Sequence, residues 1–150
     1  MRRWPLALAA LIGTLAGVGI FTFDYGEGLS DFSPDPRACR NCHVMNDEYA
    51  SWTHGPHHAT ARCIDCHLPH ALVPKYIAKA DNGYRHSKGF TFMDFHDPIM
   101  IKPRNAEILQ ENCLRSHGDF VHDIVAGSTT REDAVQCVHC HRNVGHGARP

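Results

Sequence analysis

After residue 24, the 150-residue chain has few continuous apolar stretches from which a core could be built. It has no long basic run, and its formal net charge is −1, so nothing suggests nucleic-acid binding. No segment alternates convincingly between apolar and polar residues, so β-strands are not expected. A chain with so little aliphatic material needs something other than side chains to fill its interior.

The even number of cysteines that is typical of a disulfide framework is also missing. The chain has seven Cys and thirteen His, and six of the Cys form C-x-x-C pairs followed at once by His. Disulfides have no use for that His, and so many histidines suggest metal or cofactor ligation. The intact stretches are CRNCH (39–43), CIDCH (63–67) and CVHCH (137–141), and a fourth, CLRSH (113–117), has Ser116 in place of the second Cys. The starts at 39 and 63, and at 113 and 137, are each 24 residues apart, which suggests a duplicated two-site unit.

One long apolar run is present, at the N-terminus. Residues 5–23 contain no charge, and as a helix they would span about 28 Å, close to the hydrocarbon thickness of a membrane. Two arginines precede the run and acidic residues follow it, which predicts a cytoplasmic N-terminus and an exported remainder. A cleaved signal peptide is the alternative, but the run is long for one and no clean A-x-A site follows. We therefore expect an anchor over residues 1–24 and a second domain over 25–150.

The second domain is expected to be mainly α, made of short helices and loops. Apolar spacing and capping residues predict helices capped by Asn46 and running through Trp52, from Pro74 toward Tyr84, over 105–116, and from a Thr129/Glu132 capping box to about His141. Residues 87–103 are expected to form an irregular connection.

C-x-x-C-H is the attachment signature of c-type haem. On a helical turn, positions i, i+3 and i+4 face one way, so two thiols can add to the haem vinyl groups while the His lies over the iron. Zinc sites also use C-x-x-C pairs, but they need no His fixed directly after each pair. Apart from the His that ends each motif, the candidates for second axial ligands are His54, His57, His58, His70, His86, His96, His122, His139 and His146.

Several stretches together resemble one family: CRNCHVM, SWTHGPHH, CIDCHLPH, ENCLRSHGDFVH and CVHCHRNVGH. They are similar to the small membrane subunits of cytochrome c nitrite reductase, within the NapC/NirT family of tetrahaem quinol dehydrogenases, and the resemblance covers essentially the whole chain. It implies a compact tetrahaem domain at residues 25–150 in the periplasm, held in the bacterial inner membrane by a single helix. It also implies that menaquinol donates electrons, which pass to a catalytic subunit that reduces nitrite to ammonium.

The resemblance assigns roles to individual residues. Haem attachment falls to Cys39, Cys42, Cys63, Cys66, Cys113, Cys137 and Cys140. The implied axial ligands are Met45 for the first haem, His67 with His146 for the second, His117 with His57 for the third, and His141 with a lysine of the catalytic subunit for the fourth. His57 is preferred to His58 because of the family-like W-x-H-x-x-H spacing. Quinol contact is implied for Lys79, with Asp81 or His86 as the proton acceptor.

Ser116 interrupts the third motif. A hydroxyl is a far poorer nucleophile than a thiol, so Ser116 does not form a thioether under ordinary maturation. Three readings stay open: a haem held by Cys113 alone, an empty site, or an engineered or erroneous change from a natural cysteine. The intact His117 favours the first reading.

Other functions are weighed beside electron transfer to nitrite reductase. Within the same class, the chain could be a NapC/NirT-type donor that feeds another periplasmic reductase. From other classes, it could reduce a small substrate such as hydroxylamine at a five-coordinate haem, or it could be a zinc-binding scaffold. Haem absorbance would eliminate the scaffold, and a Soret shift on adding small ligands would support the enzyme.

Overall fold

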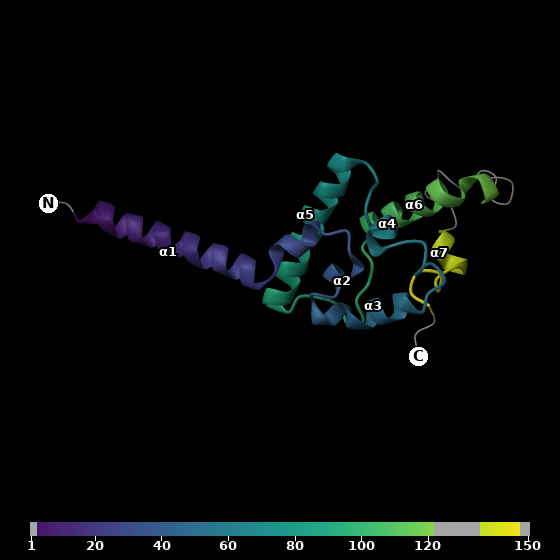
Figure 1. The fold of residues 1–150 in the computed structure, drawn as a ribbon, viewed down its shortest axis with the longest axis horizontal. Helices are drawn as coiled ribbons and strands as arrows, with labels where there is room; N and C mark the ends of the chain where they lie inside the picture. Colours follow the sequence, from purple (N-terminus) through teal and green to yellow (C-terminus); the bar gives the residue numbers. More distant parts are fainter. Residues whose placement is uncertain (1–2, 122–135, 148–150) are drawn as a thin grey trace. The chain divides into compact units, whose positions relative to one another are not determined.

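The structure, a computed structural model, describes residues 3–121 and 136–147. The chain divides into two compact units, Met1–Ser33 and Pro34–Pro150. The boundary expected after residue 24 falls one residue before the end of the first helix and inside unit 1. The described residues form helices and contain no strand, as the lack of alternating segments predicted (Figure 1).

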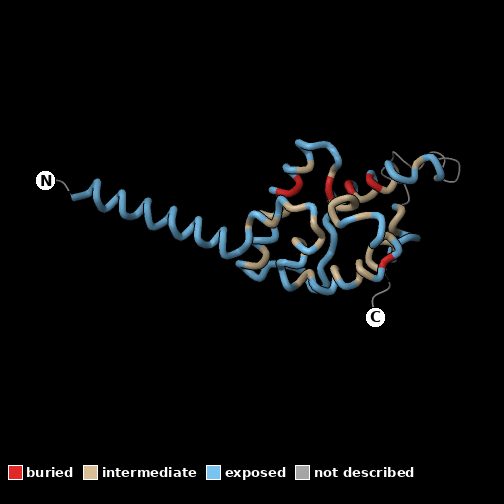
Figure 2. The backbone as a smooth tube through the Cα atoms, viewed as in Figure 1, coloured by how far each residue is buried: buried red, intermediate tan, exposed pale blue. Residues whose placement is uncertain are grey.

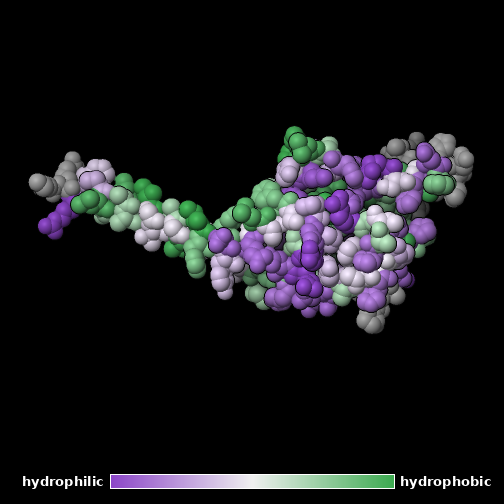
Figure 3. All heavy atoms as spheres, viewed as in Figure 1, coloured by the Kyte–Doolittle hydropathy of each residue, from purple (hydrophilic) through white to green (hydrophobic). Residues whose placement is uncertain are grey.

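Unit 1 consists of α1 (Trp4–Tyr25) and the short 3-10 helix η1 (Gly28–Phe32). Pro5 lies in the first turn of α1, where a missing N–H costs no hydrogen bond. Every described residue of α1 is exposed within the chain (Figure 2), and hydrophobic side chains follow its length (Figure 3). At about 33 Å, α1 is long and apolar enough to cross a membrane.

Unit 2 is built from short helices joined by loops, with two longer helices. In chain order these are α2 (Pro36–Cys39), η2 (His43–Met45), α3 (Asn46–Thr53), α4 (Cys63–His67), α5 (Leu72–Phe92), α6 (Pro103–Val121) and α7 (Cys137–Cys140). α6 packs against both α4 and α7. The face of unit 2 seen in Figure 3 is largely hydrophilic.

The apolar core of the described residues is very small. Within residues 3–121 and 136–147, only Leu68, Ala78 and Ile108 are buried hydrophobic residues, with Ile64 packed against them. Figure 2 shows buried positions as a few short segments among mostly exposed or half-buried backbone. The low aliphatic content noted in the sequence is therefore matched by a minimal side-chain core.

Two helices have ends that differ from the expectations. Asn46 is the first residue of α3 and not its cap; the N-cap position is taken by Met45, which makes no side-chain capping bond. α5 begins at Leu72 and continues to Phe92, so residues 87–92 of the expected irregular connection are helical. Gly89 does not end the helix. The end comes at Met93, whose φ of 53° is left-handed, and the N–H of Asp94 then donates to the Gly89 carbonyl at 2.9 Å.

The third expected helix is present and longer than predicted. α6 begins at Pro103, which suits a first helical position, and continues past Ser116 to Val121. The helix expected from the Thr129/Glu132 capping box starts outside the described residues.

Candidate haem-binding sites

The backbone of the Cys-containing motifs is helical in three cases and broken in one. The second motif forms α4, the third lies inside α6, and the fourth opens α7 with His141 as its C-cap. In the first motif, α2 ends at Cys39 and Cys42 is extended, with φ −86° and ψ 115°. The first motif therefore does not hold its two Cys and His43 on one helical turn.

Two pairs of histidine rings lie opposite each other at nearly equal distances, with their planes inclined at 51° and 73°. The ring centres of His67 and His146 are 5.9 Å apart, and those of His57 and His117 are 6.0 Å apart. Two imidazoles that bind opposite sides of one metal ion through bonds of about 2 Å have ring centres roughly 6 Å apart. The structure thus brings together both histidine pairs that the resemblance implied.

Hydrogen bonds determine which ring nitrogen of His57 and of His146 is available to bind a metal. The Nδ1 of His57 lies 3.0 Å from the Val144 carbonyl oxygen, and the Nδ1 of His146 lies 3.0 Å from the Glu48 carbonyl oxygen. A carbonyl only accepts, so each Nδ1 carries the proton and each Nε2 is left with a lone pair for a metal. Burial, and then the neighbouring His146, lower the pKa of His67, which favours the neutral imidazole that binds metals.

A close backbone contact brings the segment around His57 to the C-terminal part of the chain. Gly55 is buried, and a Cβ at this position would lie 2.6 Å from the Gly145 carbonyl oxygen. Only glycine permits this approach without a shift of the backbone. The contact explains how His57 reaches Val144, 87 residues later in the sequence.

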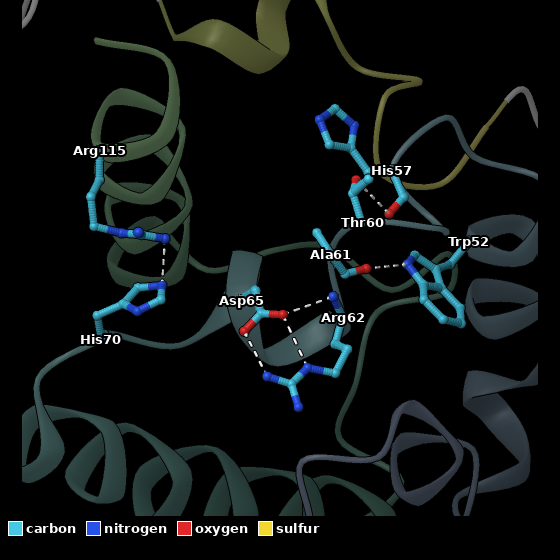
Figure 4. A network of polar contacts seen from close by, with 8 residues as sticks. All are labelled: Trp52, His57, Thr60, Ala61, Arg62, Asp65, His70 and Arg115. Carbon is cyan, nitrogen blue, oxygen red and sulfur yellow. Dashed lines mark hydrogen bonds and ion pairs between the residues drawn. The ribbon is translucent and has the colours of Figure 1, made fainter. Parts of the chain in front are cut away.

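His58 has different surroundings from its neighbour His57. Its ring packs edge-on against Trp52, with ring centres 4.8 Å apart, and Trp52 donates its indole N–H to the Ala61 carbonyl at 3.2 Å. Figure 4 shows the His57 ring pointing away from Trp52. The geometry pairs His57, and not His58, with His117.

The first motif combines a displaced histidine with a half-buried methionine. The His43 ring lies edge-on to Phe90 of α5, with centres 6.3 Å apart, and Phe90 in turn packs on Phe95 at 5.4 Å. Met45 is half-buried at the end of η2. Because His43 and Met45 are two residues apart, they cannot easily bind the iron from opposite faces of one haem.

The cysteines of neighbouring motifs lie together. A hydrogen bond with Cys39, and then burial, raise the pKa of Cys63, while burial, and then the nearby Cys137, raise that of Cys113 to about 11. The first motif thus adjoins the second, and the third adjoins the fourth. The raised pKa values of Cys63 and Cys113 make these two thiols, when unmodified, protonated at neutral pH and poorly reactive.

Side chains of α6, the helix that carries the third motif, form hydrogen bonds with neighbouring elements. The amide Nδ2 of Asn112 donates to the carbonyls of Cys66 and Leu68, at 2.8 and 2.9 Å, and the N–H of Cys137 donates to Gln110 Oε1 at 2.8 Å. Arg115 makes a short contact with His70, as Figure 4 shows. Sequence reasoning did not identify Asn112 or Gln110. The available signal for Asn112 was an amide residue directly before the third motif.

In the described part of the chain, the candidate ligand at the fourth motif is His141. His141 is exposed at the end of α7. Within residues 3–121 and 136–147, no aromatic or histidine ring packs against the His141 ring. The second and third sites differ, because each has a pair of neighbouring histidine rings.

The three candidates for quinol chemistry all lie on α5, in different settings. Lys79 is buried, with 8% of its surface exposed, whereas His86 is exposed. These two residues are seven apart, so they share one face of the helix. Asp81 lies on another face, and its carboxylate pairs with Arg85 at 2.9 Å and with Arg104 of α6 at 3.8 Å.

Comparison with known proteins identifies the family. Residues 1–119 match the N-terminal region of the NapC/NirT cytochrome c family. This chain belongs to that family. Its members carry haem c, and the paired imidazoles at about 6 Å, the Cys motifs and the small side-chain core of the described residues all fit that cofactor.

Relatives and a solved structure match almost the whole chain. The cytochrome c-type protein NrfH of Wolinella succinogenes is 34% identical over 95% of this chain and 86% of its own length. The cytochrome c nitrite reductase subunit NrfH of Nitratidesulfovibrio vulgaris is 32% identical over 97% of this chain and 87% of its own length. A crystal structure of the cytochrome c nitrite reductase NrfHA complex bound to the HQNO inhibitor matches with a TM-score of 0.65 and 29% identity, covering 93% of this chain and 90% of that one.

Proposed function

We propose that this chain is the membrane-anchored electron-transfer subunit of a cytochrome c nitrite reductase. It takes electrons from a quinol, menaquinol in the resembled family, and passes them to a catalytic subunit that reduces nitrite to ammonium. The observation that carries the proposal is the pair of preorganised His–His sites in a chain that aligns with NrfH proteins over nearly its full length. α1 serves as a single anchor in the bacterial inner membrane, with the N-terminus cytoplasmic and unit 2 in the periplasm.

Four haem c groups form the electron path. Each haem, when bound, accepts and releases one electron at a time. The contacts of Cys39 with Cys63, and of Cys113 with Cys137, support adjacent first and second sites and adjacent third and fourth sites. The packing of α4 on α6 supports adjacency of the second and third sites. We infer a path in the order of the motifs.

Met45 is the proposed ligand of the first haem. The extended backbone at Cys42 turns His43 away from a helical motif geometry, and its ring packs against Phe90. A thioether ligand raises a haem's reduction potential, which suits the position that receives electrons first.

Lys79 and His86 are the proposed quinol residues. A quinol releases two protons with its two electrons, and the haems take only the electrons, so a nearby base must accept protons. His86 shares a helix face with Lys79, and its imidazole side chain can act as a proton acceptor. Asp81 is the weaker candidate for this base because two arginines engage its carboxylate.

The third haem is proposed to be held by Cys113 alone, with His117 and His57 as ligands. The intact mass of the protein, expressed with c-type maturation machinery and denatured in acid, tests this attachment. A mass of chain plus four haems supports a single thioether at Cys113. A mass of chain plus three haems rejects it.

The second ligand of the fourth haem is proposed to come from the catalytic subunit, as a lysine. Binding the catalytic subunit should then convert a high-spin haem signal of the isolated chain to low spin. An unchanged spin state on complex formation would reject a ligand from the partner.

The alternative is a NapC/NirT-type quinol dehydrogenase that feeds another periplasmic reductase. The two functions differ in the acceptor and not in the donor site. Liposomes containing the reduced full-length chain should therefore be mixed separately with a cytochrome c nitrite reductase catalytic subunit and with a periplasmic nitrate reductase. Faster haem reoxidation with the first, in the presence of its substrate, supports the proposal, and faster reoxidation with the second supports the alternative.

A further inference from the structure

Asn112 is one of two buried polar residues among those that the structure describes, the other being Lys79. It lies directly before Cys113 on α6, and 7% of its surface is exposed. Its Nδ2 group has two hydrogens, and the structure uses both, one for the Cys66 carbonyl and one for the Leu68 carbonyl.

The two acceptor carbonyls flank His67, the proximal histidine of the second motif. One amide group therefore joins the backbone on both sides of the second site's ligand to the residue that precedes the third site's cysteine. If α6 slid along α4, these carbonyls would lose their hydrogen-bond partner and become unsatisfied buried polar groups. The free-energy cost of that loss resists the sliding.

The apolar contact in the same place is small. Leu68, Ala78 and Ile108 form the buried apolar cluster of the described residues. Such a limited contact gives little directional control over the position of a helix, whereas two hydrogen bonds of good length fix both its distance and its register.

The third site has particular need of that control. With Ser116 in place of a cysteine, its covalent connection is reduced to Cys113, and Ser116 is exposed on α6. A haem with one thioether has one covalent restraint fewer than a haem with two, so its position depends more on how firmly α6 is placed relative to its surroundings.

We propose that Asn112 is a positioning residue that holds the third haem site in register with the second and compensates for the thioether missing at Ser116. The inference rests on the proposed attachment of the third haem through Cys113. Asn112 acts through the carbonyls around His67 and through Cys113, without contacting a haem itself. Its importance should therefore depend on whether residue 116 can form a thioether.

The test is a double-mutant cycle in the full-length matured protein, using Asn112→Ala, Ser116→Cys and the combined variant. Asn112→Ser, which keeps a single donor, is a milder variant in case Asn112→Ala fails to mature. The matched control is Asn105→Ala, because Asn105 is on the same helix and donates to the Asn82 side-chain oxygen at 3.1 Å without touching the second motif. The measurements are haem count by intact mass, haem iron per chain, and the Soret circular dichroism that reports coupling between neighbouring haems.

We expect Asn112→Ala to lower the fraction of chains carrying the third haem several-fold and to weaken the Soret coupling, with a smaller loss for Asn112→Ser. We expect Asn105→Ala to change neither reading. Adding Ser116→Cys to Asn112→Ala should restore the haem count. Full retention of the haem in Asn112→Ala, an equal loss in Asn105→Ala, or a loss that Ser116→Cys does not repair would overturn the inference.

The cycle also separates this inference from the proposed attachment. If the unsubstituted chain carries only three covalent haems, attachment through Cys113 alone is rejected. The haem iron content per chain then tests the role of Asn112, because it counts bound haem whether or not the haem is covalently attached. A lower value in Asn112→Ala than in Asn105→Ala supports the positioning role, and equal values reject it.

Discussion

At the scale of single residues, adjacent histidines can have unrelated roles. His57 donates through Nδ1 to the Val144 carbonyl and faces His117, whereas the ring of His58 packs on Trp52. The sequence offers two chemically identical side chains one position apart, and only the tertiary contacts separate them. The hydrogen bond at Nδ1 prepares the opposite ring nitrogen for a metal.

Replacing His57 by Ala should open one axial position of the third haem. We expect the low-spin signal of this haem to become high spin, and added imidazole to restore it, because the small ligand can fill the space left by the ring. Electron paramagnetic resonance of the oxidised protein measures the change. His58→Ala is the matched control, and the same spin change in both variants would contradict the assignment.

Substitutions on α5 should separate the quinol residues from a structural acid. His86→Gln is expected to slow quinol oxidation by about a hundred-fold, the lower end of the usual contribution of a general base. Lys79→Met should slow it as well, by removing the buried side-chain amine that is proposed to contact the quinol. Asp81→Asn should leave the rate close to that of the unsubstituted chain and lower the melting temperature, since Asp81 pairs with Arg85 and Arg104.

These rates are measured as haem reduction by menaquinol analogues in liposomes, with dithionite reduction as the control for haem content. A large rate loss in Asp81→Asn with none in His86→Gln would reverse the proposed roles.

At the scale of elements, α6 organises unit 2. It carries the third motif and reaches α5 through Asn105, α4 through Asn112 and α7 through Gln110. Side-chain amides thus do much of the connecting that an apolar core does in other proteins. Helices held in this way depend on a few directional bonds, and each can be removed separately.

Gln110→Ala should loosen the fourth site and leave the others in place. Loss of the bond to the Cys137 N–H should cost about 1 kcal/mol and lower the melting temperature by roughly 2–4 °C. The exposed Glu107→Ala on the same helix is the control and should have little effect. A shift in the fourth haem's spectrum without any change in the second or third would locate the effect, whereas equal melting temperatures for the two variants would show that Gln110 contributes nothing.

The sequence predicts features that local spacing encodes. The apolar run predicts α1, and the Cys and His spacing predicts the four motifs and their helical turns, except at the first motif, where Cys42 is extended. The resemblance pairs His67 with His146; the structure brings these rings together, while their ligand roles stay predictions. The links from Asn112 could not be predicted, because they span 44 and 46 residues and leave no periodic signal.

At the scale of the whole molecule, the candidate haem-attachment cysteines outnumber the buried apolar side chains of the described residues. The described residues contain three buried hydrophobic side chains, against seven cysteines, all of which lie in the motifs. So small a core cannot offset the conformational entropy of ordering unit 2, and the porphyrins must contribute most of the buried apolar surface.

The haem-free chain should therefore not fold. Expressed without the maturation machinery and kept reduced in detergent, it should show helix from α1 and no cooperative thermal transition by circular dichroism. The matured protein under the same conditions is the control. A sharp transition in the haem-free chain would show that side chains alone stabilise unit 2.

The contact between Gly55 and Gly145 also has a consequence for the order of assembly. His57 bonds to a residue 87 positions later, and His146 bonds to one 98 positions earlier. During synthesis the chain presents Cys63 and Cys66 long before residues 144–146 exist. The proposed second axial ligands, His146 and His57, thus reach the second and third sites only when Gly55 and Gly145 come together. Haems attached before that point have a ligand on one side only. Closure of this long loop is therefore the step that completes both sites together.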